Sequence, residues 1–205
     1  QNYIAKTNLV VAPATEWLSQ QVDNSSVFKG KKKLKIMLSV DEKIFRPAPR
    51  ITIRKKLNLS QNSKIIFFGA TSLDFKRKGM AYLYQALELL DNKLNVRKER
   101  ILILTAGASG SEEIRTQISN NYQHVHLGYL KNDILLASAY QASNLYVCSS
   151  IEDSGPMMIN ESIICGTPVV SFEMGGALDL VHTGKTGYRA NFASSEDLAA
   201  GIEYV

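Results

Sequence analysis

Short, almost wholly apolar runs alternate along the chain with longer segments in which apolar residues recur every three or four positions. Runs such as 65–68 and 101–104 are apolar at every position, which is typical of strands covered on both faces of a sheet. We expect strands at residues 8–12, 34–38, 64–69, 100–106, 125–127, 145–148, 168–172 and 187–190.

Helical periodicity appears between these strands; Leu83, Leu87 and Leu90, for example, fall on one stripe. The segment 156–165 starts with Pro156 and ends before Gly166, which are common start and stop signals of a helix. We expect helices at residues 15–23, 80–90, 112–119, 132–142 and 156–165. Strand, helix and strand repeat about five times, which predicts an α/β fold with a doubly wound, parallel, Rossmann-like sheet. The ligand site of such a sheet lies at the carboxyl ends of its strands.

The first 30 residues hold one predicted strand and one predicted helix, which cannot bury their apolar faces alone. We expect residues 1–30 to be the tail of an N-terminal domain with a linker, and residues 31–205 to form a second domain. Residues 41–60 contain Pro47, Pro49 and a basic run, and we expect them to lead into a short helix. Because the chain lacks an initial Met and runs directly into a strand, we also expect it to be cut from a longer protein.

The composition is that of a globular protein, with 45% hydrophobic and 21% charged residues in a chain of 205. No apolar run reaches 18 residues, so no membrane-spanning helix is predicted. Cys148 and Cys165 lie in separate apolar stretches, which favours buried, reduced thiols in a cytoplasmic protein. His124 and His126 share one face of a predicted strand with no third ligand nearby, so we predict no metal site. We also expect no bound cofactor.

The net charge is +5, and five of the seven residues at 29–35 are lysines. Such a run is typical of a solvated turn before a strand. A second interpretation is peripheral contact with the inner face of an anionic membrane, where each nearby Lys contributes about 1 kcal/mol. The lysines are not interleaved with aromatic residues, so we expect no nucleic-acid partner. A basic, non-enzymatic binding module is nevertheless one alternative to the enzyme described below.

Two nucleotide-binding motifs are excluded by their spacing. Gly184-Lys185-Thr186 is similar to the end of a phosphate-binding loop, but the glycine that this loop needs five positions earlier is Asp179. The glycines at 107 and 110 lack the G-x-G-x-x-G spacing of a dinucleotide-binding fold, which argues against a dehydrogenase.

Residues 149–161 leave a strand, form a polar turn and enter a helix. Asp153 or Ser154 can cap this helix, whose free amides then offer a site for a phosphate group. Glu161 follows two turns later among apolar residues, where its carboxylate needs a polar partner such as a ribose hydroxyl. The residues expected to present the amides are Ser154, Gly155, Met157 and Met158. Pro156, which has no N–H, is expected in the same binding loop, in the first turn of the helix.

This stretch resembles the E-x7-E motif of retaining GT-B glycosyltransferases, in particular the GT4 (glycosyl transferases group 1) family. Asp153 matches the first acidic position and Glu161 the second. The first position is usually Glu, and the neighbouring Glu152 is the alternative candidate for it. Residues 162–170, 175–181 and 186–188 resemble three further motifs of the family, in the order in which the family has them.

The segment 68–79 resembles the loop after the first strand of the family's donor-binding domain. Lys78-Gly79 fits the family pattern, whereas Ala70 occupies the usual Arg position, and Lys76 or Arg77 is a candidate substitute for that arginine. Cations in this loop suit a diphosphate, which gathers negative charge as it leaves. Tyr129 follows the third strand of this domain, where the family places the nucleotide base, and it could stack on that base.

The resemblance implies the C-terminal, donor-binding half of a GT-B enzyme that transfers a hexose from a nucleotide-diphosphate sugar, with retention and without a metal. Glu161 would hold the ribose, Asp153 or Glu152 would face the sugar, and Lys78 with Lys76 or Arg77 would hold the diphosphate. The acceptor, a glycan or a lipid-linked glycan, would bind to the N-terminal half, so this chain alone is expected to be inactive. A GT-B-fold isomerase or phosphorylase is the other enzymatic alternative. Base, sugar, acceptor and oligomeric state stay open.

Overall fold

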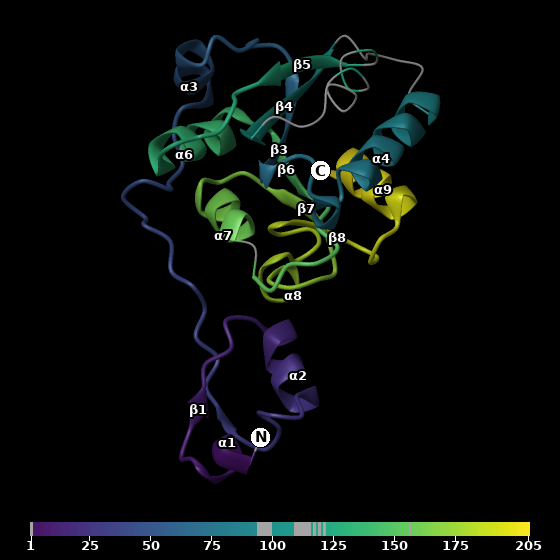
Figure 1. Ribbon diagram of the computed structural model, residues 1–205. Helices are drawn as coiled ribbons and strands as arrows, with labels where there is room; N and C mark the ends of the chain where they lie inside the picture. The colour runs from purple at the N-terminus through teal and green to yellow at the C-terminus, as the bar shows by residue number, and fades with distance from the viewer. Residues whose placement is uncertain are drawn as a thin grey trace.

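A six-stranded parallel sheet forms the body of the molecule in a computed structural model that describes residues 2–93, 100–108, 116, 118, 120, 122–155 and 157–205 (Figure 1). The strand order is β5-β4-β3-β6-β7-β8. The chain therefore builds the sheet from β3 to one side and then returns to build from β6 to the other. The point where the order reverses lies between β3 and β6, which is where open α/β sheets bind ligands. The strands are β3 Lys64–Ser72, β4 Ile101–Ala108, β5 Gln123–His126, β6 Leu145–Cys148, β7 Val169–Phe172 and β8 Gly187–Ala190.

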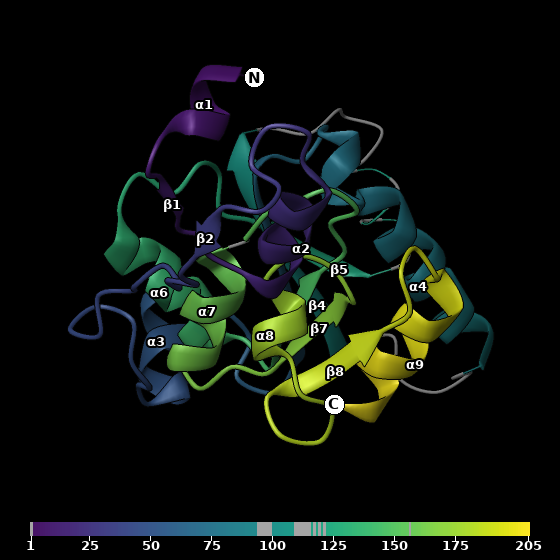
Figure 2. The ribbon, with the colours of Figure 1, turned by 90° about the horizontal axis from the view of Figure 1, so that it is seen from below.

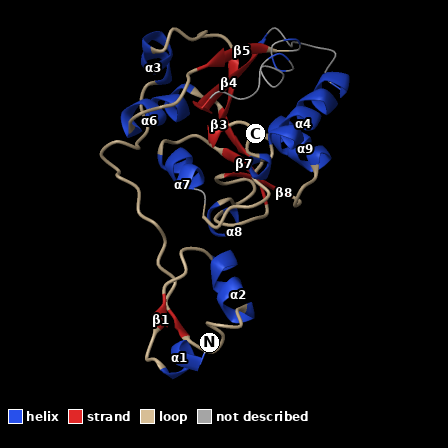
Figure 3. Ribbon diagram, in the orientation of Figure 1, coloured by secondary structure: helices blue, strands red, loops and turns tan. Residues whose placement is uncertain are grey.

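Helices cover both faces of this sheet (Figure 3). Side chains of β3 alternate between the faces: Ile65 and Phe67 belong to one apolar core, Ile66 and Phe68 to the other. The first core is closed by α3, α6 and α7, and the second by α4 and α9. The elements of this part are α3 Arg50–Lys56, the 3-10 helix η1 Lys76–Lys78, α4 Met80–Lys93, α6 Asp133–Ala142, α7 Met157–Ile164, α8 Ala177–Leu180 and α9 Ser195–Tyr204.

The N-terminal segment forms a separate small unit with its own two-stranded parallel sheet. It contains α1 Asn2–Lys6, β1 Val10–Val11, α2 Glu16–Asn24 and β2 Lys32–Lys33. Seen from below, α2 lies in front of α7 and α8, and it contacts α8 (Figure 2). A stretch without helix or strand, residues 34–49, connects this unit to α3. In the described ranges, no helix is long and apolar enough to cross a membrane.

Most predicted elements are confirmed. The predicted strands 145–148 and 187–190 coincide with β6 and β8, whereas β3 and β4 run further than expected. Helices α2, α4, α6 and α7 lie within three residues of their predicted bounds. Cys148 and Cys165 are buried free thiols, as predicted. Most of the predicted helix 112–119 lies outside the described residues.

The strand predicted at residues 34–38 is wrong, because these residues form neither a strand nor a helix. The strand in this part of the chain is β2, which consists of Lys32 and Lys33 alone. Leu34 and Ile36 donate backbone hydrogen bonds to Val11 and Pro13. Pro13 has no N–H with which to return a bond, so the ladder does not continue. The apolar side chains of residues 34 and 36–38 consequently remain exposed.

Candidate functional site

A cavity of about 230 Å³ lies at the carboxyl ends of β3 and β4. One wall is formed by the last residues of these strands, and another by α7 together with the segment that follows β5. Because parallel strands end at the same edge, the cavity lies where the fold predicts a ligand site. Its lining residues are Gly69, Ala70, Thr71, Ala106, Gly107, Tyr129, Leu130, Leu136, Met158 and Glu161.

Two glycines allow the walls to come this close together. Gly107 has φ +147°, and a Cβ there would lie 2.1 Å from the carbonyl oxygen of Ala70. A Cβ on Gly69 would lie 2.5 Å from the terminal methyl group of Met158. A Cβ at Gly107 would collide with the backbone of β3, whereas a Cβ at Gly69 would displace the end of the Met158 side chain, and either change would alter the shape of the cavity.

Glu161 places its carboxylate between the core and this cavity. The residue is only 9% exposed, and its Oε2 accepts a hydrogen bond of 2.9 Å from the hydroxyl of Tyr140. Within the described ranges, Oε1 accepts no hydrogen bond. Burial raises the pKa of Glu161; the Tyr140 hydroxyl opposes this shift, and the negative charge of Asp133 adds to it. The carboxylate thus has one oxygen fixed by the protein and one available to a ligand.

Lys78 and Asp153 form an ion pair between the loop after β3 and the loop after β6. Lys78 Nζ lies 2.5 Å from Asp153 Oδ2, and Arg77 Nη1 lies 3.9 Å from the same oxygen. Asp153 Oδ1 accepts a hydrogen bond from the amide of Gly155, ahead of α7. The carboxylate of Asp153 therefore links Arg77 and Lys78, in the basic loop at residues 76–78, to the start of α7.

Gly79 allows the basic loop to pack closely against Ser149, the residue that follows β6. It has φ +71°, and a Cβ at this position would lie 1.8 Å from the carbonyl oxygen of Ser149. The hydroxyl of Ser149 donates to the carbonyl of Gly79 at 2.9 Å, and the amide of Ile151 donates to the carbonyl of Arg77. These contacts join the two loops at the point where the strand order reverses.

The predicted site residues fall into two groups and a remainder. Ala70, Tyr129, Met158 and Glu161 line the cavity, and Tyr129 is 59% exposed there. The ion-pair group consists of Lys78 and Asp153, together with Arg77, which also donates to the carbonyl of Glu152. The remaining predicted residues belong to neither group. Lys76, Glu152 and Ser154 are exposed, and Pro156 lies outside the described residues. Gly155 and Met157 line a small gap together with Thr15.

Tyr140 is a functional candidate that the sequence patterns do not reveal. It lies in the last turn of α6, 21 residues before Glu161, and a sequence pattern does not distinguish it from other aromatic residues of the core. Thr71, Gly107 and Leu136 also line the cavity without having been predicted.

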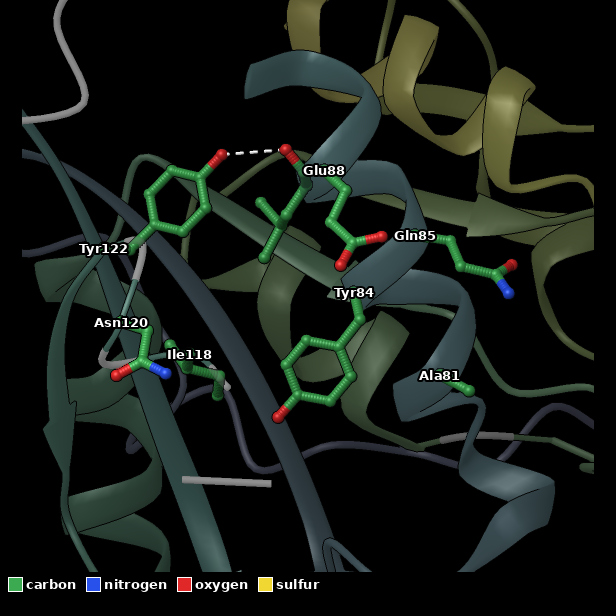
Figure 4. A pocket seen from close by; sticks show the side chains of 8 residues that line it. Ala81, Tyr84, Gln85, Glu88, Ile118, Asn120 and Tyr122 are labelled. Atoms are coloured by element: carbon green, nitrogen blue, oxygen red, sulfur yellow. Dashed lines mark hydrogen bonds between the residues drawn. The ribbon is translucent and has the colours of Figure 1, made fainter. Parts of the chain in front are cut away.

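The other large cavities hold few of the predicted residues. One, of about 390 Å³, lies beside α4 and is lined by Tyr84, Gln85 and Glu88 among others (Figure 4). At its edge the Tyr122 hydroxyl lies 2.9 Å from the carbonyl oxygen of Leu87. Another, of about 540 Å³, includes Phe75 and Lys76 at the start of α4.

His124 and His126 lie on one face of β5 and share a partner. His124 Nε2 and His126 Nδ1 lie 2.8 Å and 2.9 Å from the hydroxyl of Thr105 on β4. Their contact with this hydroxyl gives the pair a structural role in the β4–β5 ladder.

Comparison with known proteins places the chain in a family. Residues 62–205 match the model of glycosyl transferases group 1. The chain is 27% identical over 173 residues to D-inositol 3-phosphate glycosyltransferase of Thermobispora bispora, covering 80% of this chain and 40% of the relative. It is 30% identical over 151 residues to the enzyme of the same name from Gordonia bronchialis, covering 70% and 32%. The match thus spans less than half the length of these curated relatives.

Solved structures share the fold. A glycosyltransferase from Rickettsia africae superposes with a TM-score of 0.80 at 20% identity, over 99% of this chain and 55% of that one. HepE of Anabaena, in complex with UDP and glucose, gives 0.73 at 21% identity, over 96% and 53%. The C-terminal domain of a Francisella tularensis group 1 glycosyl transferase gives 0.67 at 18% identity, over 80% and 86%. The parallel sheet is that of the Rossmann-like domains of GT-B glycosyltransferases, and the chain belongs to the glycosyl transferases group 1 family.

Proposed function

We propose that the chain is the nucleotide-sugar-binding half of a cytoplasmic, retaining glycosyltransferase. The enzyme would transfer a hexose from a nucleotide-diphosphate sugar to a glycan or lipid-linked acceptor. The observation that carries this proposal is the carboxylate of Glu161, which is nearly buried and fixed through Oε2 beside a cavity at the strand ends, while its Oε1 accepts no hydrogen bond from the described residues. An anionic oxygen in such a place needs a donor, and a pentose hydroxyl supplies one. The UDP bound in HepE of Anabaena is consistent with a nucleotide in this fold.

The diphosphate is assigned to the region of Lys78. Its ammonium group is already held near the entrance of α7 by Asp153, so it is positioned before a ligand arrives. A diphosphate, with at least two negative charges, competes with the single charge of Asp153 for this cation. The backbone amides at the start of α7, from Met157 onward, contribute further donors. Arg77 is more exposed and adds charge with less fixed geometry.

During transfer, the bond between the anomeric carbon and the diphosphate oxygen breaks, and the leaving group takes the electron pair. Lys78 and the nearby amides stabilise the negative charge that develops on that oxygen. The acceptor hydroxyl bonds to the anomeric carbon on the same face of the sugar and gives its proton to the departing diphosphate oxygen. Asp153 or Glu152 faces the donor sugar, and the acceptor site lies outside this chain, so the isolated chain binds nucleotide without turnover.

Calorimetry with UDP, GDP and ADP tests the proposal. We expect one of the three to bind, and Glu161→Gln to weaken its binding about tenfold or more, because an amide oxygen accepts a hydrogen bond less strongly than a carboxylate. Glu203→Gln, an exposed carboxylate on α9, is the matched control and should leave binding unchanged. Absence of binding by all three nucleotides, or equal binding by Glu161→Gln and the unmodified chain, would falsify the proposal.

A further inference from the structure

Tyr140 is held rigidly in the core between α6 and the sheet. Its side chain is fully buried. The ring packs edge-on against Phe67 at 5.3 Å and against Tyr146 at 5.4 Å, with interplanar angles of 79° and 88°, and Phe45 lies 6.4 Å away. Edge-to-face contacts of this kind favour one ring orientation. The ring therefore has little freedom to turn.

The backbone of Tyr140 is fixed as well. Its carbonyl oxygen accepts hydrogen bonds from the hydroxyl of Thr167 at 2.8 Å and from the amide of Ser143 at 2.9 Å. Because the ring and the backbone are both held, the position of the hydroxyl oxygen is fixed. This oxygen lies 2.9 Å from Oε2 of Glu161 and donates a hydrogen bond to it.

We propose that Tyr140 is a positioning residue, whose hydroxyl fixes the carboxylate of Glu161 so that Oε1 faces the cavity in its ionised form. The inference rests on the proposed function of Glu161. Tyr140 is fully buried and does not line the cavity, so it acts on a ligand only through Glu161.

The charges around Glu161 explain why this hydroxyl matters. Among the described residues, four titratable groups influence Glu161 or are influenced by it: Asp133 and Tyr140 on α6, Tyr146 on β6 and Cys165 after α7. Burial raises the pKa of Cys165 to about 12 and those of both tyrosines well above their ordinary value, so these groups are neutral at pH 7. Asp133 disfavours ionisation of Glu161, and the Tyr140 hydrogen bond favours it. Removal of this hydroxyl therefore raises the pKa of Glu161 further.

The test compares Tyr140→Phe with Tyr146→Phe in the full chain. Both changes remove a buried hydroxyl from the same aromatic cluster, but only the hydroxyl of Tyr140 bonds to Glu161. The first measurement is the titration of the Glu161 carboxyl carbon by NMR, with the signal assigned by its loss in Glu161→Gln. The second is the affinity for UDP, GDP and ADP between pH 5 and pH 8. Thermal unfolding confirms that each variant is folded.

We expect Tyr140→Phe to move the Glu161 titration to higher pH by about one unit, and Tyr146→Phe to leave it in place. Nucleotide affinity at pH 7 should fall about tenfold in Tyr140→Phe, as for the loss of one hydrogen bond to a charged group. The pH below which affinity is lost should rise in the same variant. In the Glu161→Gln background, Tyr140→Phe should have almost no further effect on affinity.

An unchanged Glu161 titration in Tyr140→Phe, or an equal shift in Tyr146→Phe, overturns the inference. The same holds if Tyr140→Phe weakens binding as much in the Glu161→Gln background as in the unmodified chain. If no nucleotide binds, or if Glu161→Gln binds normally, the proposed function fails instead. The NMR titration needs no ligand, so it decides the role of Tyr140 in that case too.

Discussion

Lys78 and Asp153 form an ion pair in which both side chains are shielded from solvent, at 16% and 15% exposure. Exposed pairs contribute about 0–1 kcal/mol, because water and salt screen them. A shielded pair interacts more strongly and is held in a narrower range of positions. Arg77, at 46% exposure and 3.9 Å from the same carboxylate, lacks this restraint. Of these two cations Lys78 is the better fixed, which is why the proposed diphosphate contact is assigned to it.

Replacement of Lys78 by Met should weaken the binding of a nucleoside diphosphate about tenfold or more, because one charge-assisted contact is lost. Binding of the matching nucleoside, which carries no phosphate, should change little. Lys64→Met, an exposed lysine at the opposite end of β3, serves as the control. Calorimetry with each pair of ligands checks this. Equal losses for nucleoside and diphosphate would show that Lys78 does not contact phosphate.

At the scale of elements, the site depends on loops pressed against strand ends. Gly79 and Gly107 lie where their backbones contact the carbonyls of Ser149 and Ala70. Both have positive φ, which disfavours residues with a Cβ, and at both positions a Cβ would also clash with a carbonyl oxygen. Gly30 in the N-terminal unit has a similar φ of +79°, but a Cβ there would meet no atom within 4 Å. A substitution at Gly30 therefore measures the cost of the positive φ alone, without the cost of a steric clash.

Substitution of Gly30 by Ala should cost about 1–2 kcal/mol, the penalty of a left-handed backbone for a residue with a Cβ. The same substitution at Gly79 should cost about 3 kcal/mol or more, because the methyl group also collides with the Ser149 carbonyl. It should weaken nucleotide binding as well, since it lifts Lys78 from its place. Urea unfolding measures the difference between the variants. A cost at Gly79 no greater than at Gly30 would contradict the packing argument.

At the scale of the whole molecule, Asp179 connects the N-terminal unit to the large sheet. Its Oδ2 accepts a hydrogen bond of 2.8 Å from the amide of Glu16, in the first turn of α2, and its Oδ1 lies 2.8 Å from Lys35 Nζ. A carboxylate at the start of a helix is stabilised by the unpaired amides there. Thr15, which caps α2, donates in addition to the carbonyl of Ser154, in the loop that leads to α7. Thr15 thus links the start of α2 to the loop between β6 and α7.

Replacement of Asp179 by Asn should loosen α2 without affecting the six-stranded sheet. The neutral side chain loses both the ion pair with Lys35 and most of its interaction with the helix start. Amide hydrogen exchange should become faster in α2 and remain slow in β3 and β4. Asp23→Asn, which removes an exposed pair with Lys33 inside the N-terminal unit, is the control and should have little effect. Unchanged exchange in α2 of the Asp179 variant would rule out this attachment.

The fold class and the positions of most strands could be predicted from local patterns of apolar residues. Strands buried on both faces are apolar throughout, and this signal is local, so β3, β4 and β6 can be recognised from consecutive residues alone. Glu161 could be predicted for a similar reason, since a charged residue within an apolar helix stands out. The strand expected at 34–38 failed because its pairing depends on Pro13, which lies in a different part of the N-terminal unit.

The contacts between functional groups, in contrast, could not be predicted, because they join distant parts of the chain. The ion pair of Lys78 with Asp153 joins residues 75 positions apart, and the bond from Tyr140 to Glu161 joins residues on two different helices. The cavity itself needs strand ends, a loop after β5 and α7 in one place. A hydrophobic pattern records whether a residue is buried, but not which neighbour it touches. Partners are set by the order of the strands and the close approach of their loops, and these arise only when the whole chain packs together.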